Sequence, residues 1–186
     1  KALRIRSATA RGGDSTAGNV IAETGGRFIR VVGIDCSITN ATANSMNGLL
    51  QLSSDGWKVL GNTFRDPANR TIINNNHGLY VQGGADDLEA AYNSFLGLHM
   101  GHVVQIHQDG ELKLYERLWL HDNLIESVLS TDTRGMTASN IHPDSTVTFE
   151  RNTLRNLGQN FSAISVYSGK VTIKDMGVTK GARAAI

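Results

Sequence analysis

Four asparagines recur at an almost constant interval along the chain, and this interval constrains the fold more than any other feature. Asn62, Asn93, Asn123 and Asn152 are separated by 31, 30 and 29 residues. Asparagine tolerates left-handed backbone at a bend, and its amide can hydrogen-bond to an identical amide one repeat away. The spacing therefore predicts a chain that returns to the same position about every 30 residues, with the asparagines stacked.

The asparagines belong to a segment that occurs six times. Its copies are FIRVVGIDCSI (28–38), WKVLGNTF (57–64), LEAAYNSF (88–95), LWLHDNLI (118–125), VTFERNTL (147–154) and VTIKDMGV (171–178). When the copies are aligned, three apolar columns run from Ile29 to Val171, from Val31 to Ile173 and from Cys36 to Val178. Apolar residues two positions apart share one face of a strand, so each copy predicts a strand with a buried face, followed by a bend and a further inward residue.

A second type of strand alternates with the first. Its copies are NVIAE (19–23), LLQLS (49–53), LYVQG (79–83), VQIHQ (104–108), SNIHP (139–143) and AISVY (163–167). Equivalent strands that recur at a fixed interval stack in parallel, and the helical crossovers that a flat parallel sheet needs are absent. The repeats predict an all-β fold, a single-stranded parallel β-helix (solenoid) of about six coils.

The N-x-F coils and the strand HGLYV (77–81) resemble the repeats of the right-handed parallel β-helix family of pectate-lyase-like and tailspike-like proteins. The resemblance covers roughly residues 19–180. It implies a right-handed helix, a location outside the cell or on a cell or virion surface, and a polysaccharide as the partner. In the lyases of this family a base removes a proton beside a uronate carboxylate, which Ca²⁺ or a basic side chain neutralises.

Length and composition narrow the function classes. We expect one domain over residues 1–186, with residues 1–18 as a partial first coil or cap, and a C-terminal end where further sequence or a second subunit of a homo-oligomer continues the stack. The net charge of +1 argues against nucleic-acid and anionic-membrane partners, and no apolar run is long enough to span a bilayer. The single cysteine excludes an internal disulfide framework.

The outward residues of the second strand type predict a binding ridge. One outward column contains Gln51, Tyr80, Gln105 and Asn140, and the next contains Gln82, His107, His142 and Tyr167. Amides and imidazoles suit sugar hydroxyls, and tyrosine suits a ring face, so the ridge is a candidate for binding an extended polysaccharide. The alternative is an ordinary solvated sheet face. Trp119 also points outward, where it could stack on a sugar or a neighbouring subunit, whereas His121 is expected to face solvent beside Asp122.

Within this ridge the pattern I-H-x-D-small occurs twice, at Ile106–Gly110 and Ile141–Ser145. The pattern predicts that His107 and His142 stack on adjacent coils, where mutual repulsion would keep one imidazole neutral as a base. The two aspartates of the pattern are expected to make turns. For a lyase, the remaining candidates are Tyr167 as the acid and Lys113 or Arg117 as the neutralising cation. No acidic cluster for Ca²⁺ is visible, so no cofactor is assigned.

Two hypotheses remain open at this level. The first is a carbohydrate-active β-helix that binds, and in its catalytic form cleaves, a polysaccharide by β-elimination. The second is a structural or adhesive module without catalysis. Whether the protein is an enzyme is left undecided.

Overall fold

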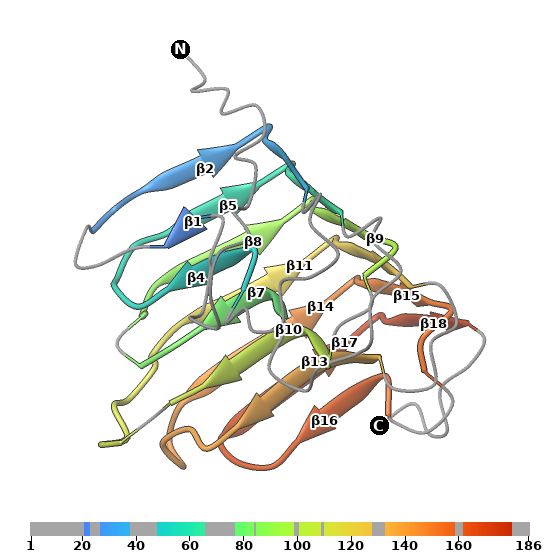
Figure 1. Cartoon of the computed structure of the whole chain (residues 1–186). Coiled ribbons are helices and arrows are strands. Elements are labelled where there is room, and N and C mark those ends of the chain that lie inside the picture. The colour runs from blue at the N-terminus through green and yellow to red at the C-terminus, as the bar shows by residue number, and fades with distance from the viewer. Residues whose placement is uncertain are drawn as a thin grey trace, which may run out of the picture.

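A computed structural model describes residues 21–22, 27–37, 48–65, 77–83, 85–98, 101–108, 110–127, 133–158 and 162–179. The partial first coil predicted over residues 1–18, and the chain end at 180–186, lie outside these ranges. The described residues form a parallel β-solenoid built from three sheets, with no helix in these ranges, so the all-β prediction is confirmed (Figure 1).

Each coil contributes one short strand to each sheet. Sheet A contains β1 (Ile21–Ala22), β4 (Leu50–Leu52), β7 (His77–Val81), β10 (His102–His107), β13 (Arg134–Ser139) and β16 (Ile164–Val166). Sheet B contains β2 (Arg30–Val32), β5 (Lys58–Leu60), β8 (Leu88–Ala91), β11 (Leu118–His121), β14 (Thr146–Glu150) and β17 (Lys170–Lys174). Sheet C contains β3 (Asp35–Ser37), β6 (Thr63–Arg65), β9 (Ser94–Leu96), β12 (Leu124–Glu126), β15 (Thr153–Arg155) and β18 (Gly177–Thr179).

The solenoid has about four turns, which is slightly fewer than the six coils predicted. Each sheet has six strands. All strand pairs are parallel and join each strand to its equivalent in the next coil, as the repeat predicted.

The three apolar columns of the first strand type lie inside the solenoid. In the register of sheets B and C, Val59 pairs with Ala90 and Phe64 pairs with Phe95. The same register puts Trp57 opposite Leu88. The rings of Phe64 and Phe95 stack with centroids 4.9 Å apart. Side chains of this size each contribute roughly 1.5–3 kcal/mol when removed from water, so the stacked columns stabilise every interface between coils.

The asparagines form a continuous ladder at the bend between sheets B and C. The Nδ2 group of each donates to Oδ1 of the next, at 2.9 Å for Asn62 to Asn93, for Asn93 to Asn123 and for Asn123 to Asn152. All four are buried. A buried amide in this position satisfies both of its own polar atoms and a backbone N–H of the coil before it.

Left-handed backbone occurs one residue earlier than the sequence argument placed it. Tyr92, Asp122 and Arg151, which precede three of the ladder asparagines, have φ of 59°, 52° and 50°. The preceding residue makes the bend, and this leaves the asparagine side chain free to point inward and bond along the solenoid axis. Glycine also fits here, because it has no Cβ that would clash in the left-handed conformation. Gly61 occupies the equivalent position before Asn62 with φ of 63°.

Replacement of Asn123 by alanine should lower the free energy of unfolding by about 2 kcal/mol or more. The change removes four hydrogen bonds and leaves the buried backbone N–H of Asn93 without its acceptor. Urea unfolding followed by circular dichroism measures the loss. The control is Ser94→Ala, at a half-buried position of the same bend that does not belong to the ladder. An equal loss of unfolding free energy in the two variants would contradict this account.

Candidate functional site

Three charged or titratable residues begin consecutive strands of sheet A. His77, His102 and Arg134 are the first residues of β7, β10 and β13, and the strand register pairs His102 with each of the other two. The imidazole centroids of His77 and His102 are 5.5 Å apart, and the His77 ring lies 4.9 Å from that of Tyr80. We call His77, Tyr80, His102, Arg134 and Thr137 the histidine–arginine cluster.

The cluster lies on the outer face of sheet A, yet most of it is shielded from water. Tyr80 and Thr137 alternate with core residues along β7 and β13, so both point away from the interior. His77 is 4% exposed, His102 7%, Tyr80 7% and Thr137 1%, whereas Arg134 is half-buried. The guanidinium therefore connects a buried polar group of side chains to solvent.

The hydrogen-bond partners determine the tautomers of the two histidines. Nδ1 of His77 lies 3.3 Å from the carbonyl oxygen of His102, which can only accept, so Nδ1 carries the proton and Nε2 is an acceptor. Nε2 of His102 lies 2.9 Å from Nη1 of Arg134, which can only donate, so the proton of His102 is on Nδ1. That N–H group, and Oγ1 of Thr137, are buried and have no hydrogen-bond partner among the described residues.

Both imidazoles are neutral at pH 7. Burial lowers the pKa of His77 to about 4, with a further decrease from the nearby His107, and the bond to the His102 carbonyl opposes this shift. Burial also lowers the pKa of His102 to about 3, assisted by the charges of His77 and Arg134. The cluster therefore combines one permanent cation with two uncharged imidazoles.

Stability should fall as the pH is lowered from 6.5 to 4. In the unfolded chain the histidines protonate near their usual pKa of 6.5, whereas the folded protein resists protonation, so the unfolded state binds more protons across this interval. Each histidine contributes a slope of at most about 1.4 kcal/mol per pH unit. Urea unfolding at several pH values measures this slope, and the double variant His77→Gln, His102→Asn should reduce it. An unchanged slope in that variant would contradict the assignment.

The structure places part of the predicted ridge in one row. Gln51 pairs with Tyr80, and Tyr80 with Gln105, as the repeat predicted. Gln82 accepts a hydrogen bond from Nε2 of Gln51 at 2.6 Å. The glutamines are half-buried, so they border the histidine–arginine cluster, while Tyr80 is buried within it.

The predicted stack of His107 on His142 is wrong. The strand in that coil is β13 at Arg134–Ser139, three residues before the predicted position, so Ser139 pairs with His107 and Thr137 pairs with Gln105. Nδ1 of His107 lies 3.1 Å from Oγ of Ser139. The error arose because β13 presents only Met136 and Ala138 to the core, a weak apolar signal, whereas the more apolar turn that contains Ile141 imitated a strand.

Asn140 and His142 consequently lie in a turn and not on the ridge. Asn140 has φ of 48° and its Nδ2 donates to the carbonyl of Gln108. Nδ1 of His142 accepts from the backbone N–H of Asp144 at 3.1 Å. Both side chains support the turn that joins β13 to β14.

The remaining predicted residues follow the edge where sheet A leads into sheet B. Lys113 lies in the segment between β10 and β11, where its backbone N–H and carbonyl bind the side chain of Gln108. Arg117 forms an ion pair with Asp87, with Nη2 and Oδ1 2.7 Å apart, at the entry to sheet B. Tyr167 follows β16 and is 71% exposed. The roles assigned to these three residues stay predictions.

Sequence reasoning did not assign His77, His102, Arg134 or Thr137 to the predicted ridge. A signal was present in the glycines: His77-Gly78-Leu79-Tyr80 and Arg134-Gly135-Met136-Thr137 share the order basic, Gly, apolar, polar. A Cβ on Gly78 would lie 2.8 Å from the carbonyl oxygen of Val103, and one on Gly135 would overlap that of Ala163. Both strands therefore need glycine at their second residue. This shared glycine identifies where each strand starts, and the strand start sets the register of the residues that follow.

Comparisons of the chain with protein-family models, curated proteins and solved structures found no match. Within the described ranges, three or more His, Cys, Asp or Glu side chains nowhere gather in a way that could hold a metal ion. The same ranges contain no helix suited to crossing a membrane.

Proposed function

We propose that this protein binds an extended, carboxylate-bearing polysaccharide across the outer face of sheet A. The observation that carries the proposal is the pair of buried polar groups without a described partner, Nδ1–H of His102 and Oγ1 of Thr137, in the same cluster as the guanidinium of Arg134. Buried donors are almost always satisfied in native proteins, so unpaired ones favour a missing ligand. A carboxylate accepts from hydroxyl, imidazole and guanidinium donors together.

A polymer is favoured over a small anion because the neighbouring groups repeat along the solenoid axis. Gln51, Tyr80 and Gln105 succeed one another at the spacing of parallel strands, about 4.8 Å. The half-buried amides of Gln51 and Gln105 lie on either side of the buried Tyr80, two strand spacings apart. This arrangement supports a chain-like ligand that crosses the strands, in a protein located outside the cell or on a cell or virion surface.

Cleavage by β-elimination is the catalytic form of the same proposal. A base removes the proton beside the carboxylate, the glycosidic C–O bond breaks as a C=C bond forms, and the departing oxygen takes a proton from solvent, while a cation stabilises the developing charge. His107, half-buried beside Ser139 and close enough to lower the pKa values of both cluster histidines, is the candidate base. Arg134 replaces Lys113 and Arg117 as the candidate neutralising cation, because it belongs to the same outer face.

Thr137→Val is the sharpest test of binding. The variant removes a buried hydroxyl that has no described partner and keeps the side-chain shape, so stability should stay the same or rise. Binding of polygalacturonate, measured by isothermal titration calorimetry, should weaken about fivefold or more with the loss of one hydrogen bond. Dextran, which lacks carboxylates, is the neutral comparison ligand.

Arg134→Gln should weaken binding of polygalacturonate by tenfold or more, since a charge-assisted contact is lost. Arg155→Gln, at an exposed position of sheet C, makes the same change in net charge and should leave the affinity unchanged. Equal affinities in the two variants would show that bulk charge, and not the cluster, holds the ligand. Release of unsaturated uronate, followed by its ultraviolet absorbance, tests cleavage, and its persistence in His107→Ala would remove His107 as the base.

The second candidate is a structural or adhesive module, and the buried asparagine ladder favours it. A ladder that satisfies every amide makes a stiff, protease-resistant rod without any need for a ligand. Absence of binding to every anionic and neutral glycan tested, from a protein that unfolds cooperatively, would support this candidate over the first. Its partner would then be a further coil or subunit at one end of the solenoid, measurable as a mass above the monomer.

A further inference from the structure

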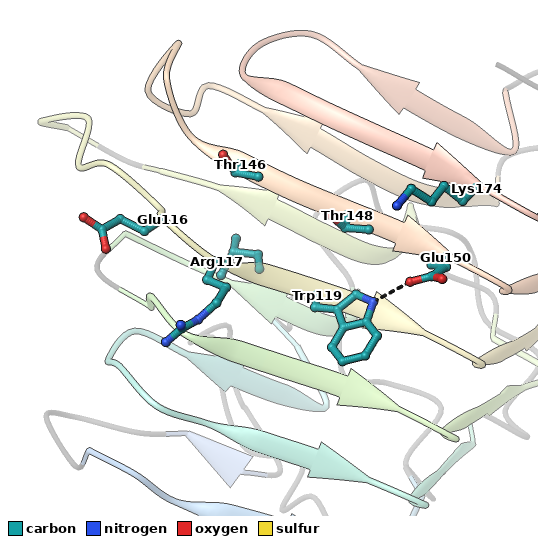
Figure 2. A pocket seen from close by; sticks show the side chains of 8 residues that line it. Glu116, Arg117, Trp119, Thr146, Thr148, Glu150 and Lys174 are labelled. Atoms are coloured by element: carbon teal, nitrogen blue, oxygen red, sulfur yellow. Dashed lines mark hydrogen bonds between the residues drawn. The ribbon is translucent and has the colours of Figure 1, made fainter.

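The outer face of sheet B contains an open groove of about 280 Å³, on a different wall of the solenoid from the histidine–arginine cluster (Figure 2). Its lining includes the indole of Trp119, the hydroxyl-bearing Thr146 and Thr148, and the charged Glu116 and Lys174. Trp119 pairs with Thr148 across β11 and β14, so the two side chains are neighbours on one face. We call this feature the Trp119 groove.

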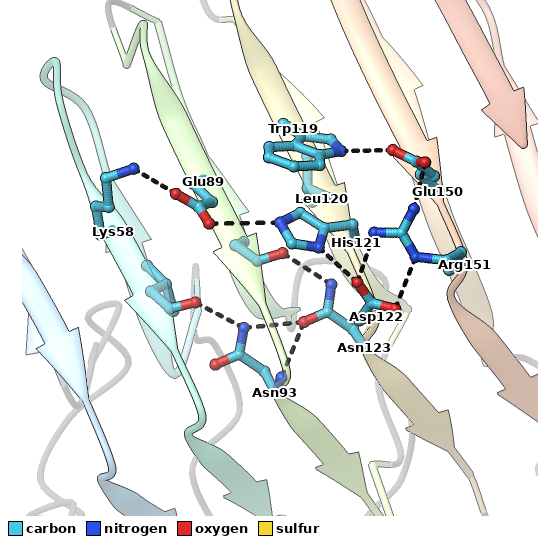
Figure 3. A network of polar contacts seen from close by, with 12 residues as sticks. Lys58, Glu89, Asn93, Trp119, Leu120, His121, Asp122, Asn123, Glu150 and Arg151 are labelled. Carbon is cyan, nitrogen blue, oxygen red and sulfur yellow. Dashed lines mark hydrogen bonds and ion pairs between the residues drawn. The ribbon is translucent and has the colours of Figure 1, made fainter.

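Trp119 is held in a single orientation. Its Nε1–H donates to Oε2 of Glu150 at 2.9 Å. One face of the indole stacks on the imidazole of His121, with centroids 3.8 Å apart and planes inclined by 26° (Figure 3). The side chain is nevertheless 38% exposed, which leaves part of the ring system open to solvent.

His121 is itself fixed from two sides, which corrects the prediction that it faces solvent. It is only 3% exposed because Trp119 stacks on it and Tyr92 approaches it edge-on, with centroids 5.6 Å apart. Its Nδ1 lies 2.7 Å from Oδ2 of Asp122, and its Nε2 lies 3.4 Å from Oε1 of Glu89. The support under the indole therefore extends across β8 and β11.

Arg151 ties the two carboxylates of this support together. It binds Oδ2 of Asp122 through Nη2 at 2.8 Å and contacts Glu150 through Nη1. The guanidinium, followed by His121, lowers the pKa of Asp122 to about 2, so this carboxylate stays charged. An aromatic ring whose orientation is set before binding loses little conformational freedom when a ligand stacks on it.

The remaining groups around the ring are polar and of both charges. Thr146 and Thr148 present hydroxyls, and Lys174 forms no ion pair with any residue in the described ranges. Lys174 pairs with Glu150 in the strand register and Trp119 lies two strands away, so the backbones of Lys174 and Trp119 are about 10 Å apart along the axis. An aromatic face, a hydroxyl on the next strand and a cation on the strand beyond it match an acidic oligosaccharide that crosses the strands.

We propose that the Trp119 groove is a second saccharide-binding site, in which a pyranose ring of an acidic oligosaccharide stacks on Trp119, hydrogen-bonds to Thr148 and directs a carboxylate to Lys174. The site is independent of the histidine–arginine cluster, because it is built on another sheet. An aromatic side chain with one polar end is well suited to such a contact.

The chain's two tryptophans make the proposal directly measurable. Trp57 is 2% exposed in the core, so acrylamide quenching reports mainly on Trp119. Oligogalacturonate should change the emission saturably and protect Trp119 from quenching. Unchanged quenching at concentrations that saturate calorimetric binding would overturn the proposal. Protection that depends on protein concentration without sugar would overturn it as well, since a second copy would then cover the groove.

Conservative variants separate this site from the first. Thr148→Val should raise the dissociation constant measured by Trp119 fluorescence about fivefold, whereas Thr63→Val, the same change on sheet C, should leave it unaltered. Lys174→Met should weaken oligogalacturonate and leave cello-oligosaccharide unchanged. Arg134→Gln should leave the Trp119 signal intact even where it removes binding at sheet A. A fluorescence response lost in Arg134→Gln but kept in Thr148→Val would overturn the proposal and assign the response to sheet A.

Discussion

The rest of the structure depends on hydrogen bonds between successive coils, and the asparagine ladder concentrates them. Oδ1 of Asn123 accepts from both the backbone N–H and Nδ2 of Asn93, at 3.0 and 2.9 Å. Its own Nδ2 donates to Asn152 and to the carbonyl of Ala90. A slip of one residue would break these bonds and turn the apolar columns outward. The ladder therefore fixes the register of sheets B and C, and the register decides which outward side chains become neighbours (Figure 3).

The fold was predictable where large side chains and asparagines repeat. Inward residues such as Val59, Ala90 and Leu120 alternate with outward residues along each strand. This period of two, repeated over several copies, identifies a strand and its buried face. The strand β13 was missed because its inward residues are Met136 and Ala138, which carry little apolar signal. Its register is set by tertiary packing against β10, which no local pattern contains.

The candidate site was less predictable than the fold for the same reason. Gln51, Tyr80 and Gln105 could be aligned because their strands are regular. The approach of Arg134 to His102 follows from the register of β13. An error of three residues there places Thr137 beside His102, Asn140 beside Gln105 and His142 beside His107. The alternation of residues along a strand also could not predict that outward residues such as Tyr80 and His121 are buried. Alternation distinguishes the two faces of a strand but does not show what covers the outer face.

The two outer faces perform different physical tasks on one scaffold. Sheet A buries neutral imidazoles beside a cation, whereas sheet B fixes an indole through a chain of carboxylates and a guanidinium. Each arrangement draws residues from consecutive coils, so neither could exist on a single repeat. The residues that repeat in every coil set the backbone geometry, and the residues that differ between coils supply the polar and aromatic groups of the two faces.

The direction of the ladder has a mechanical consequence. Its bonds, like those of the three sheets, run parallel to the solenoid axis, and only one crossing of the chain joins each coil to the next. A force applied to the two chain ends would detach one coil at a time, and each coil between two ladder asparagines would release 29 to 31 residues. At about 3.5 Å per extended residue this is roughly 100 Å per step, so this part of the molecule would lengthen in nearly equal increments, each resisted by one asparagine pair together with the strand pairs of the three sheets.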